Sequence, residues 1–233
     1  MKIALVALLS CTGIGTSVGL AVQQRLATPT LTPRQAEILS HMDLVDMEDD
    51  HGVLHRTLII TGVNVQIAAG DGSHFSSMQT GNLIVGYPNR APSGSHNIIH
   101  GESASAVDSS SCLVSGYVAE AYNSVNSVVI GWGSRIENGN NDAVVGGKEN
   151  RILNLTSGGT GFNVVTGGEG GFICGGEGSV IMGGLDNHIQ SPGLCNTIAG
   201  GFQNFVAAEQ AACLSSGDSF ASVATQNRPV VAT

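Results

Sequence analysis

Residues 127–136 read Ser-Val-Val-Ile-Gly-Trp-Gly-Ser-Arg-Ile, and their first five residues form a pattern that the chain repeats. One polar residue is followed by three mostly apolar residues and a glycine. The copies end at Gly86, Gly101, Gly116, Gly131, Gly146, Gly167, Gly183, Gly200 and, more weakly, Gly217. Successive glycines are 15 residues apart four times, and then 21, 16, 17 and 17 residues apart. A fixed period of this length is typical of solenoids, in which each repeat forms one coil of a stack.

Each repeat also has a second, weaker half. Counted from the last glycine of each strand, the third following residue is small or an amide and the fifth is apolar, as at Asn150 and Ile152. The alternation predicts a second short strand. The glycine is expected to form a corner, and the polar first residue a turn. We therefore predict an all-β fold, a parallel β-solenoid with coils of about 15 residues and a short N-terminal helix.

The strong strand is apolar on both faces. The column three residues before the first glycine contains Leu83, Ile98, Leu113, Val128, Ala143, Val164, Val180, Thr197 and Leu214. The next column contains Ile84, Ile99, Val114, Val129, Val144, Val165, Ile181, Ile198 and Ser215. Neighbouring residues of a strand face opposite sides, and the interior of a coil buries one side. Burial of the other side predicts a homo-oligomer, and we expect a homotrimer.

The composition agrees with a stack of short strands and limits the partners. The chain has 233 residues with 33 glycines, and only 12% of the residues are charged and 4% aromatic. Tight corners use glycine, and residues that face neighbouring coils are seldom charged. The net charge is −9, and the sequence has no cluster of Lys and Arg. These features argue against nucleic acid and against docking on anionic lipid.

Residues 1–21 are predicted to be a signal peptide or an anchor. Lys2 precedes an apolar stretch over residues 3–22, and Gly19-Leu20-Ala21 offers a cleavage site of the small-x-small kind. Two alternatives are an uncleaved anchor, since residues 3–22 are uncharged and long enough to span a bilayer, and a lipoprotein signal ending at Cys11. All three place the rest of the chain outside the cytoplasm, secreted or at the cell surface. No other membrane-spanning segment is predicted.

Residues 22–80 are interpreted as a linker, a short helix and an N-terminal cap. Thr32-Pro33-Arg34-Gln35 is a helix start with a capping box, and predicts a helix from about Pro33 to His41. Residues 46–52 are interpreted as an acidic turn, and residues 58–60 and 63–67 as strands. A cap is expected because the terminal coil of a solenoid exposes apolar side chains and an unpaired strand edge.

The repeats define the remaining boundaries. Residues 81–217 are predicted to form the repeat domain, with a loop around residues 155–161 that bulges from one coil. Residues 218–233 lack the pattern and are predicted to be a C-terminal tail. Asn154-Leu155-Thr156 matches an N-glycosylation acceptor, a pattern that often occurs by chance.

The cysteines permit disulfides in an exported chain. Besides Cys11, the sequence contains Cys112, Cys174, Cys195 and Cys213. Cys195 and Cys213 are 18 residues apart, close to one local repeat. Stacked coils are about 4.8 Å apart, which is within reach of a disulfide. We predict a Cys195–Cys213 pair, with free buried thiols as the alternative.

Residues 127–136 resemble the head repeat of YadA-type trimeric autotransporter adhesins, which reads Ser-Val-Ala-Ile-Gly-x-x-Ser-x-Ala. The resemblance covers about residues 81–217. It implies a left-handed parallel β-roll, three chains packed side by side, and binding to extracellular matrix or other surfaces. The resemblance is to the head alone, because the sequence has no heptads like those of the stalk and no strands like those of the membrane anchor. Several coils also carry Asn-x-Ile, as at Asn150, where the family has Ser-x-Ala.

No motif predicts a reaction, a cofactor or a metal site. The glycine-rich residues 158–161 and 167–171 lack the Lys-Ser/Thr of a phosphate-binding loop. His51 and His55 follow two aspartates, but Gly52 argues against the helix that would bring these histidines to one face. We predict that the chain is not an enzyme.

Three aromatic residues are the candidate ligand site. Tyr87, Tyr117 and Trp132 each follow the strand glycine, in the first, third and fourth coils. They are interpreted either as packing at the corners or as a binding platform. The leading prediction is an exported structural or surface solenoid without enzymatic activity. The alternatives are an adhesive module that binds extracellular polysaccharide or matrix, and a polysaccharide-active β-helix enzyme.

Overall fold

The computed structural model describes residues 31–68, 70, 80–91, 93–155, 161–190, 194–207, 212–213, 220–221 and 229–230. Contacts between residues divide the chain into two units, Met1–Asn64 and Val65–Thr233. Residues 1–21, the predicted signal or anchor, lie outside the described part. No helix among the described residues is long and apolar enough to cross a membrane.

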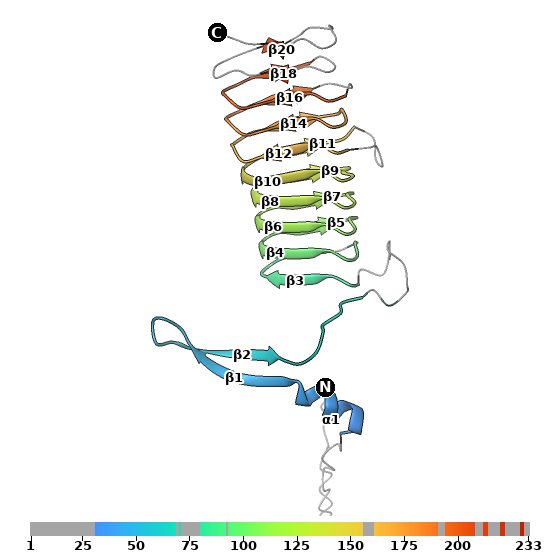
Figure 1. The fold of residues 1–233 in the computed structure, drawn as a ribbon, viewed down its shortest axis with the longest axis vertical. Helices are drawn as coiled ribbons and strands as arrows, with labels where there is room; N and C mark the ends of the chain where they lie inside the picture. The colour runs from blue at the N-terminus through green and yellow to red at the C-terminus, as the bar shows by residue number, and fades with distance from the viewer. Residues whose placement is uncertain are drawn as a thin grey trace, which may run out of the picture. The chain divides into compact units, whose positions relative to one another are not determined.

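The second unit is a parallel β-solenoid, drawn as a stack of rungs in Figure 1. Its ten-stranded sheet consists of β3 (Leu83–Gly86), β4 (Ile98–Glu102), β6 (Leu113–Tyr117), β8 (Val128–Trp132), β10 (Ala143–Lys148), β12 (Val164–Thr166), β14 (Val180–Ile181), β16 (Thr197–Ile198), β18 (Ala212–Cys213) and β20 (Pro229–Val230). Its eight-stranded sheet consists of β5 (Ser105–Val107), β7 (Glu120–Tyr122), β9 (Arg135–Glu137), β11 (Arg151–Leu153), β13 (Phe172–Cys174), β15 (His188–Gln190), β17 (Phe205–Val206) and β19 (Phe220–Ala221).

The register confirms the fold class and the coil length. In the ten-stranded sheet Ile99 pairs with Val114, which pairs with Val129, so each partner lies one 15-residue repeat further along the chain. The weaker halves form the eight-stranded sheet, where Ile136 pairs with Ile152. From β4 to β19, each coil therefore contributes a strong strand to one sheet and a weak strand to the other.

The core is a double column of aliphatic side chains. From the second coil onward, one predicted column of the strong strand faces inward and is fully buried, as at Val114, Val129 and Val144. The weak strands add Ile136 and Ile152, which are also fully buried. Ile84, in the first strand of the ten-stranded sheet, is 45% exposed because it lies at the end of the stack.

Polar side chains form ladders inside the coils. From the second to the eighth repeat the first residue is buried inside the coil, where sequence reasoning expected a turn. The backbone N–H of Cys112 donates to Asn97 Oδ1 (2.9 Å), and that of Ser179 donates to Asn163 Oδ1 (2.9 Å). A second ladder accompanies the weak strands, where the N–H of Gly171 donates to Asn150 Oδ1 (2.9 Å). At the corners, some buried N–H groups have no partner in the strand ladders, and these side-chain amides accept their hydrogen bonds.

The strand glycines allow neighbouring coils to approach each other. Gly116 has φ +134°, a conformation that L side chains rarely adopt. A Cβ atom built on Gly116 would overlap the carbonyl oxygen of Gly131 in the next coil, and Gly101 is placed in the same way against Gly116. The repeating glycine is thus required by backbone conformation and by the spacing between coils.

The first unit is a helix followed by a hairpin. Helix α1 (Pro33–Ser40) begins at Thr32, which forms the predicted capping box with Gln35. Strands β1 (Met42–Glu48) and β2 (Leu54–Ile60) pair antiparallel. Two interpretations are corrected. The acidic segment 46–52 begins inside β1 and turns only after Glu48, and residues 63–67 form no strand.

Two short strands lie in the predicted tail. β19 pairs with β17, and β20 pairs with β18, so both sheets gain a strand beyond the predicted end of the repeats, at residues 220–221 and 229–230. Backbone pairing needs no particular side chain, which is why the sequence pattern missed these strands. Residues 156–160, within the predicted loop, lie outside the described residues.

Candidate functional site

The outer face of the ten-stranded sheet has two rows without charge. We call these rows the apolar face. One row consists of Leu83, Ile98, Leu113, Val128, Ala143, Val164, Val180 and Thr197. The other consists of Val85, His100, Ser115, Ile130, Val145 and Thr166. None of these positions holds Asp, Glu, Lys or Arg.

The side chains of the apolar face are half-buried or exposed. Ile98 is 49% exposed and Val145 44% exposed, whereas their inward neighbours are fully buried. The predicted outward column is confirmed from Leu83 to Thr197. Its last member is wrong, because the register places Ala212, and not Leu214, beside Thr197.

A third outward row follows the last glycine of each strand, and we call it the ridge. Its members in register are Glu102, Tyr117, Trp132, Lys148, Glu169, Leu185 and Phe202. Tyr87 follows Gly86, which pairs with Gly101, so it lies in line with the ridge at the first coil. Tyr87 is 85% exposed and is separated from Tyr117 by the rung of Glu102.

The structure brings two of the three predicted aromatic residues together. The ring centroids of Tyr117 and Trp132 are 6.1 Å apart, and each residue is 48% exposed. The Lys148 Nζ atom lies 4.9 Å from the centre of the Trp132 ring and 2.7 Å from Glu169 Oε1. The hydrogen bond to Glu169 raises the pKa of the Lys148 amine. An aromatic pair, Tyr117 and Trp132, thus lies next to a charged pair, Lys148 and Glu169, along the ridge.

Sequence reasoning missed the later members of the ridge. Strands from β10 onward end in paired glycines, such as Gly146-Gly147, and the register between β10 and β8 shifts there. The extra residue moves Lys148 to the position that Trp132 holds one coil earlier. Lys148 and Phe202 could have been found in the sequence by taking the residue directly after the last glycine of each strand, the same reference point that was used for the weak half of the coil.

The outer face of the eight-stranded sheet is different because its centre is charged. Arg135 pairs with Glu120 (3.4 Å) and Glu137 (2.8 Å), and Arg151 also pairs with Glu137 (2.9 Å). These charges are half-buried or exposed and form ion pairs within the chain. The two sheets therefore present outer surfaces of different chemistry.

Further along the same face, three rings stack. His188 lies between Phe172 and Phe205, with centroid distances of 4.7 and 5.0 Å. Burial between these rings lowers the pKa of His188. The neutral imidazole is therefore favoured, and the stack extends the side-chain ladder of this sheet.

The histidines next to the acidic segment form a local contact. His55 Nε2 lies 2.9 Å from Asp49 Oδ2, and the N–H groups of His51 and Val53 donate to Asp49 Oδ1. The hydrogen bond with His55 and those two N–H groups lower the pKa of Asp49. Among the described residues, no three His, Cys, Asp or Glu side chains are grouped so that they could hold a metal ion.

The structure gives the predicted disulfide no support. Cys195 has a free, exposed thiol. The strand register places Cys213 beside Ile198, three residues beyond Cys195, so the backbone does not align the two cysteines. The side chain of Cys213 lies outside the described residues. Cys112 matches the alternative, since it is a free buried thiol whose pKa is raised to about 11 by burial.

The glycosylation acceptor is inaccessible in the folded chain. Asn154 is 4% exposed, and its Nδ2 donates to the carbonyl oxygen of Asn138 (3.1 Å) and to Asp142 Oδ2 (2.6 Å). A glycan on this nitrogen would require the coil to open.

Comparisons of the chain with family models, with curated proteins and with solved structures gave no match. The likeness to the adhesin head repeat consequently stands on the repeat motif and on the parallel β-solenoid.

Proposed function

We propose that the chain is an exported structural protein without enzymatic activity, secreted or held at the cell surface, and that it associates as a homotrimer through the apolar face. The observation that carries the proposal is the absence of charge from the two outward rows of the ten-stranded sheet. A large exposed apolar patch on a folded domain marks an interaction surface. Export is supported by the sequence of residues 1–21.

The contrast between the two sheets selects the interface. The eight-stranded sheet carries Arg135, Glu137 and Arg151, which form ion pairs at its surface. Water solvates such groups well, and burying them would be costly. The apolar face has no such groups, and burying a side chain such as Val128 contributes about 1 kcal/mol or more.

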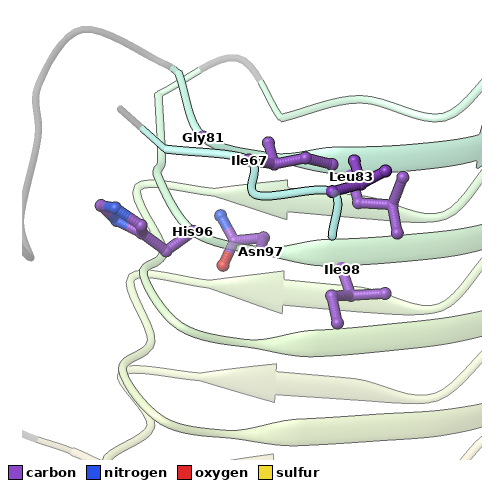
Figure 2. A pocket seen from close by; sticks show the side chains of 7 residues that line it. Ile67, Gly81, Leu83, His96, Asn97 and Ile98 are labelled. Atoms are coloured by element: carbon purple, nitrogen blue, oxygen red, sulfur yellow. The ribbon is translucent and has the colours of Figure 1, made fainter. Parts of the chain in front are cut away.

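Two further apolar residues, Val65 and Ile67, line a pocket with the first members of the apolar face. This shallow pocket of about 290 Å³ is also lined by Leu83 and Ile98 (Figure 2). Leu83 and Ile98 nevertheless remain 42% and 49% exposed. The number of copies, three, is supported by the resemblance of the repeat to trimeric heads.

A charge on the apolar face is expected to separate the copies. Val128→Lys would bury an unpaired ammonium group in the interface, and we expect association to weaken by about 100-fold or more. The measurement is sedimentation velocity over a dilution series. The matched control is Val107→Lys, the same change on the outer face of the eight-stranded sheet, where the side chain is also half-buried. Equal effects of the two changes, with both variants folded, would contradict the assigned interface.

A second candidate function is recognition of an extended polysaccharide along the ridge. The alignment of Tyr117, Trp132 and Lys148 favours it, because exposed aromatic rings offer flat apolar surfaces and the ammonium attracts anionic groups. The three side chains lie on successive coils in one row, which suits an extended polymer.

Replacing Trp132 tests that candidate. Trp132→Ala is expected to weaken binding to the polysaccharides that the wild-type chain retains on a glycan array by about ten-fold or more. Tyr122→Ala is the control, because Tyr122 is also exposed but lies on the eight-stranded sheet. Wild-type binding by the Trp132 variant, or no glycan bound by the wild type, would remove this candidate.

A further inference from the structure

Residues 31–64, the described part of the N-terminal unit, contain no core of their own. Among residues 31–64, all of which the structure describes, none is buried. The large apolar side chains that are exposed there are Leu31, Ile38, Leu39, Leu44, Met47, Val53, Leu54, Leu58, Ile60 and Val63. An isolated two-stranded hairpin is marginal in water and needs a surface to pack against. The hairpin therefore requires a partner surface.

One face of the hairpin concentrates these side chains. Leu44 pairs with Leu58 and Met42 pairs with Ile60, so the four side chains lie on the same face. Leu44 is 62% exposed and Leu58 53% exposed. The next pair on this face is Asp46 and Arg56, whose side chains form an ion pair of 3.1 Å. The charges neutralise each other, so two such faces can meet without repulsion from them.

Chain connectivity brings the hairpins of associated copies close together. Residues 61–64 join β2 to Val65, a tether of at most about 14 Å. Two of the residues that follow, Val65 and Ile67, line a pocket together with Leu83 and Ile98 at the beginning of the apolar face, and Figure 2 shows Ile67 beside Leu83. In copies that associate through that face, the short tether would hold each hairpin near the interface. The short tethers raise the effective concentration of one hairpin for another.

We propose that the hairpins of neighbouring copies pack against one another through Leu44, Leu58 and Ile60, and form a shared apolar cap. This inference rests on the proposed association of the solenoids. The occupant of the hairpin face is then a second copy of the same segment. The cap supplies the buried surface that a single hairpin lacks, and it forms only when copies assemble.

Photo-crosslinking in the full chain tests the inference. A benzophenone amino acid is introduced in place of Leu58, and irradiated samples are separated by size under denaturing and reducing conditions. Covalent dimers and trimers are expected. The matched control places the same group at Thr57, the neighbouring residue on the opposite face of β2, where the yield between chains should be several-fold lower.

Sedimentation of the same samples distinguishes failure of the shared cap from failure of the proposed solenoid interface. An oligomer that crosslinks at Leu58 only within one chain, or not at all, would overturn the shared cap and leave the solenoid interface standing. A monomer would overturn the proposed association and the shared cap together. To allow for a benzophenone that disturbs the packing, the oligomer of Leu44→Glu is compared with the wild type. The shared cap predicts that the variant dissociates at a higher protein concentration than the wild type on dilution, and an unchanged midpoint concentration would contradict it.

Discussion

Gly116→Ala is expected to destabilise the solenoid by about 3 kcal/mol or more. The added Cβ atom would overlap the carbonyl oxygen of Gly131, which is a backbone atom of the next coil and cannot rotate away. Alanine is also strained at φ +134°. The two coils would have to separate locally, which breaks ladder hydrogen bonds. The urea midpoint at fixed protein concentration measures the loss.

Gly200→Ala separates the clash from the strain. Gly200 has a similar φ of +142°, but a Cβ atom there would meet nothing within 4 Å. The alanine adds backbone strain at this site but no steric clash, so we expect it to lower the free energy of unfolding by about 1–2 kcal/mol. Equal losses of stability in the two variants would contradict the claim that the repeating glycine is needed for the close approach of neighbouring coils.

Asp142→Asn is expected to cost about 3 kcal/mol although it removes a buried charge. Asp142 is 1% exposed, and burial raises its pKa. Its Oδ1 accepts from the N–H of Asn163 (2.7 Å), and its Oδ2 accepts from Asn154 Nδ2 (2.6 Å) and the N–H of Asn140 (3.2 Å). An asparagine has one oxygen, so its amide nitrogen would face a donor in either orientation: the N–H of Asn163 in one, and Asn154 Nδ2 with the N–H of Asn140 in the other. The unsatisfied groups outweigh the relief of desolvation.

A double-mutant cycle with Asn154→Ala isolates that contact. Removing Asn154 takes away one of the donors that an asparagine at position 142 would face. The loss in the double variant should therefore be smaller than the sum of the two single losses by about 1–3 kcal/mol. Chemical denaturation of the four proteins provides the cycle. Strict additivity would mean that the Asp142–Asn154 hydrogen bond contributes nothing specific.

The architecture could be predicted because one residue type recurs at each structural position. The glycine column gave the coil length, and the aliphatic columns gave strand orientation, as Val129 inside and Val128 outside illustrate. The inward direction of Asn97 and Asn163 was not predicted, since a polar residue before a strand reads equally well as a turn. Only the three-dimensional corner shows that these amides satisfy N–H groups of the next coil.

The N-terminal hairpin and the ridge were harder to predict for different reasons. β1 contains Asp43, Asp46 and Glu48, and its pairing with β2 overrides a composition typical of a turn. On the ridge, aromatic residues were recognisable one by one as Tyr117 and Trp132. Lys148 could be placed beside them only after the shift at the paired glycines was known.

Sedimentation equilibrium of the wild-type chain at micromolar concentration tests the central claim most directly. The claim is that the uncharged outer rows of the ten-stranded sheet are an interface between copies. The account predicts a single species with three times the mass of the chain, which Val128→Lys converts to monomer. A stable wild-type monomer at that concentration would contradict the account, because the apolar face would then be exposed to water in the functional state.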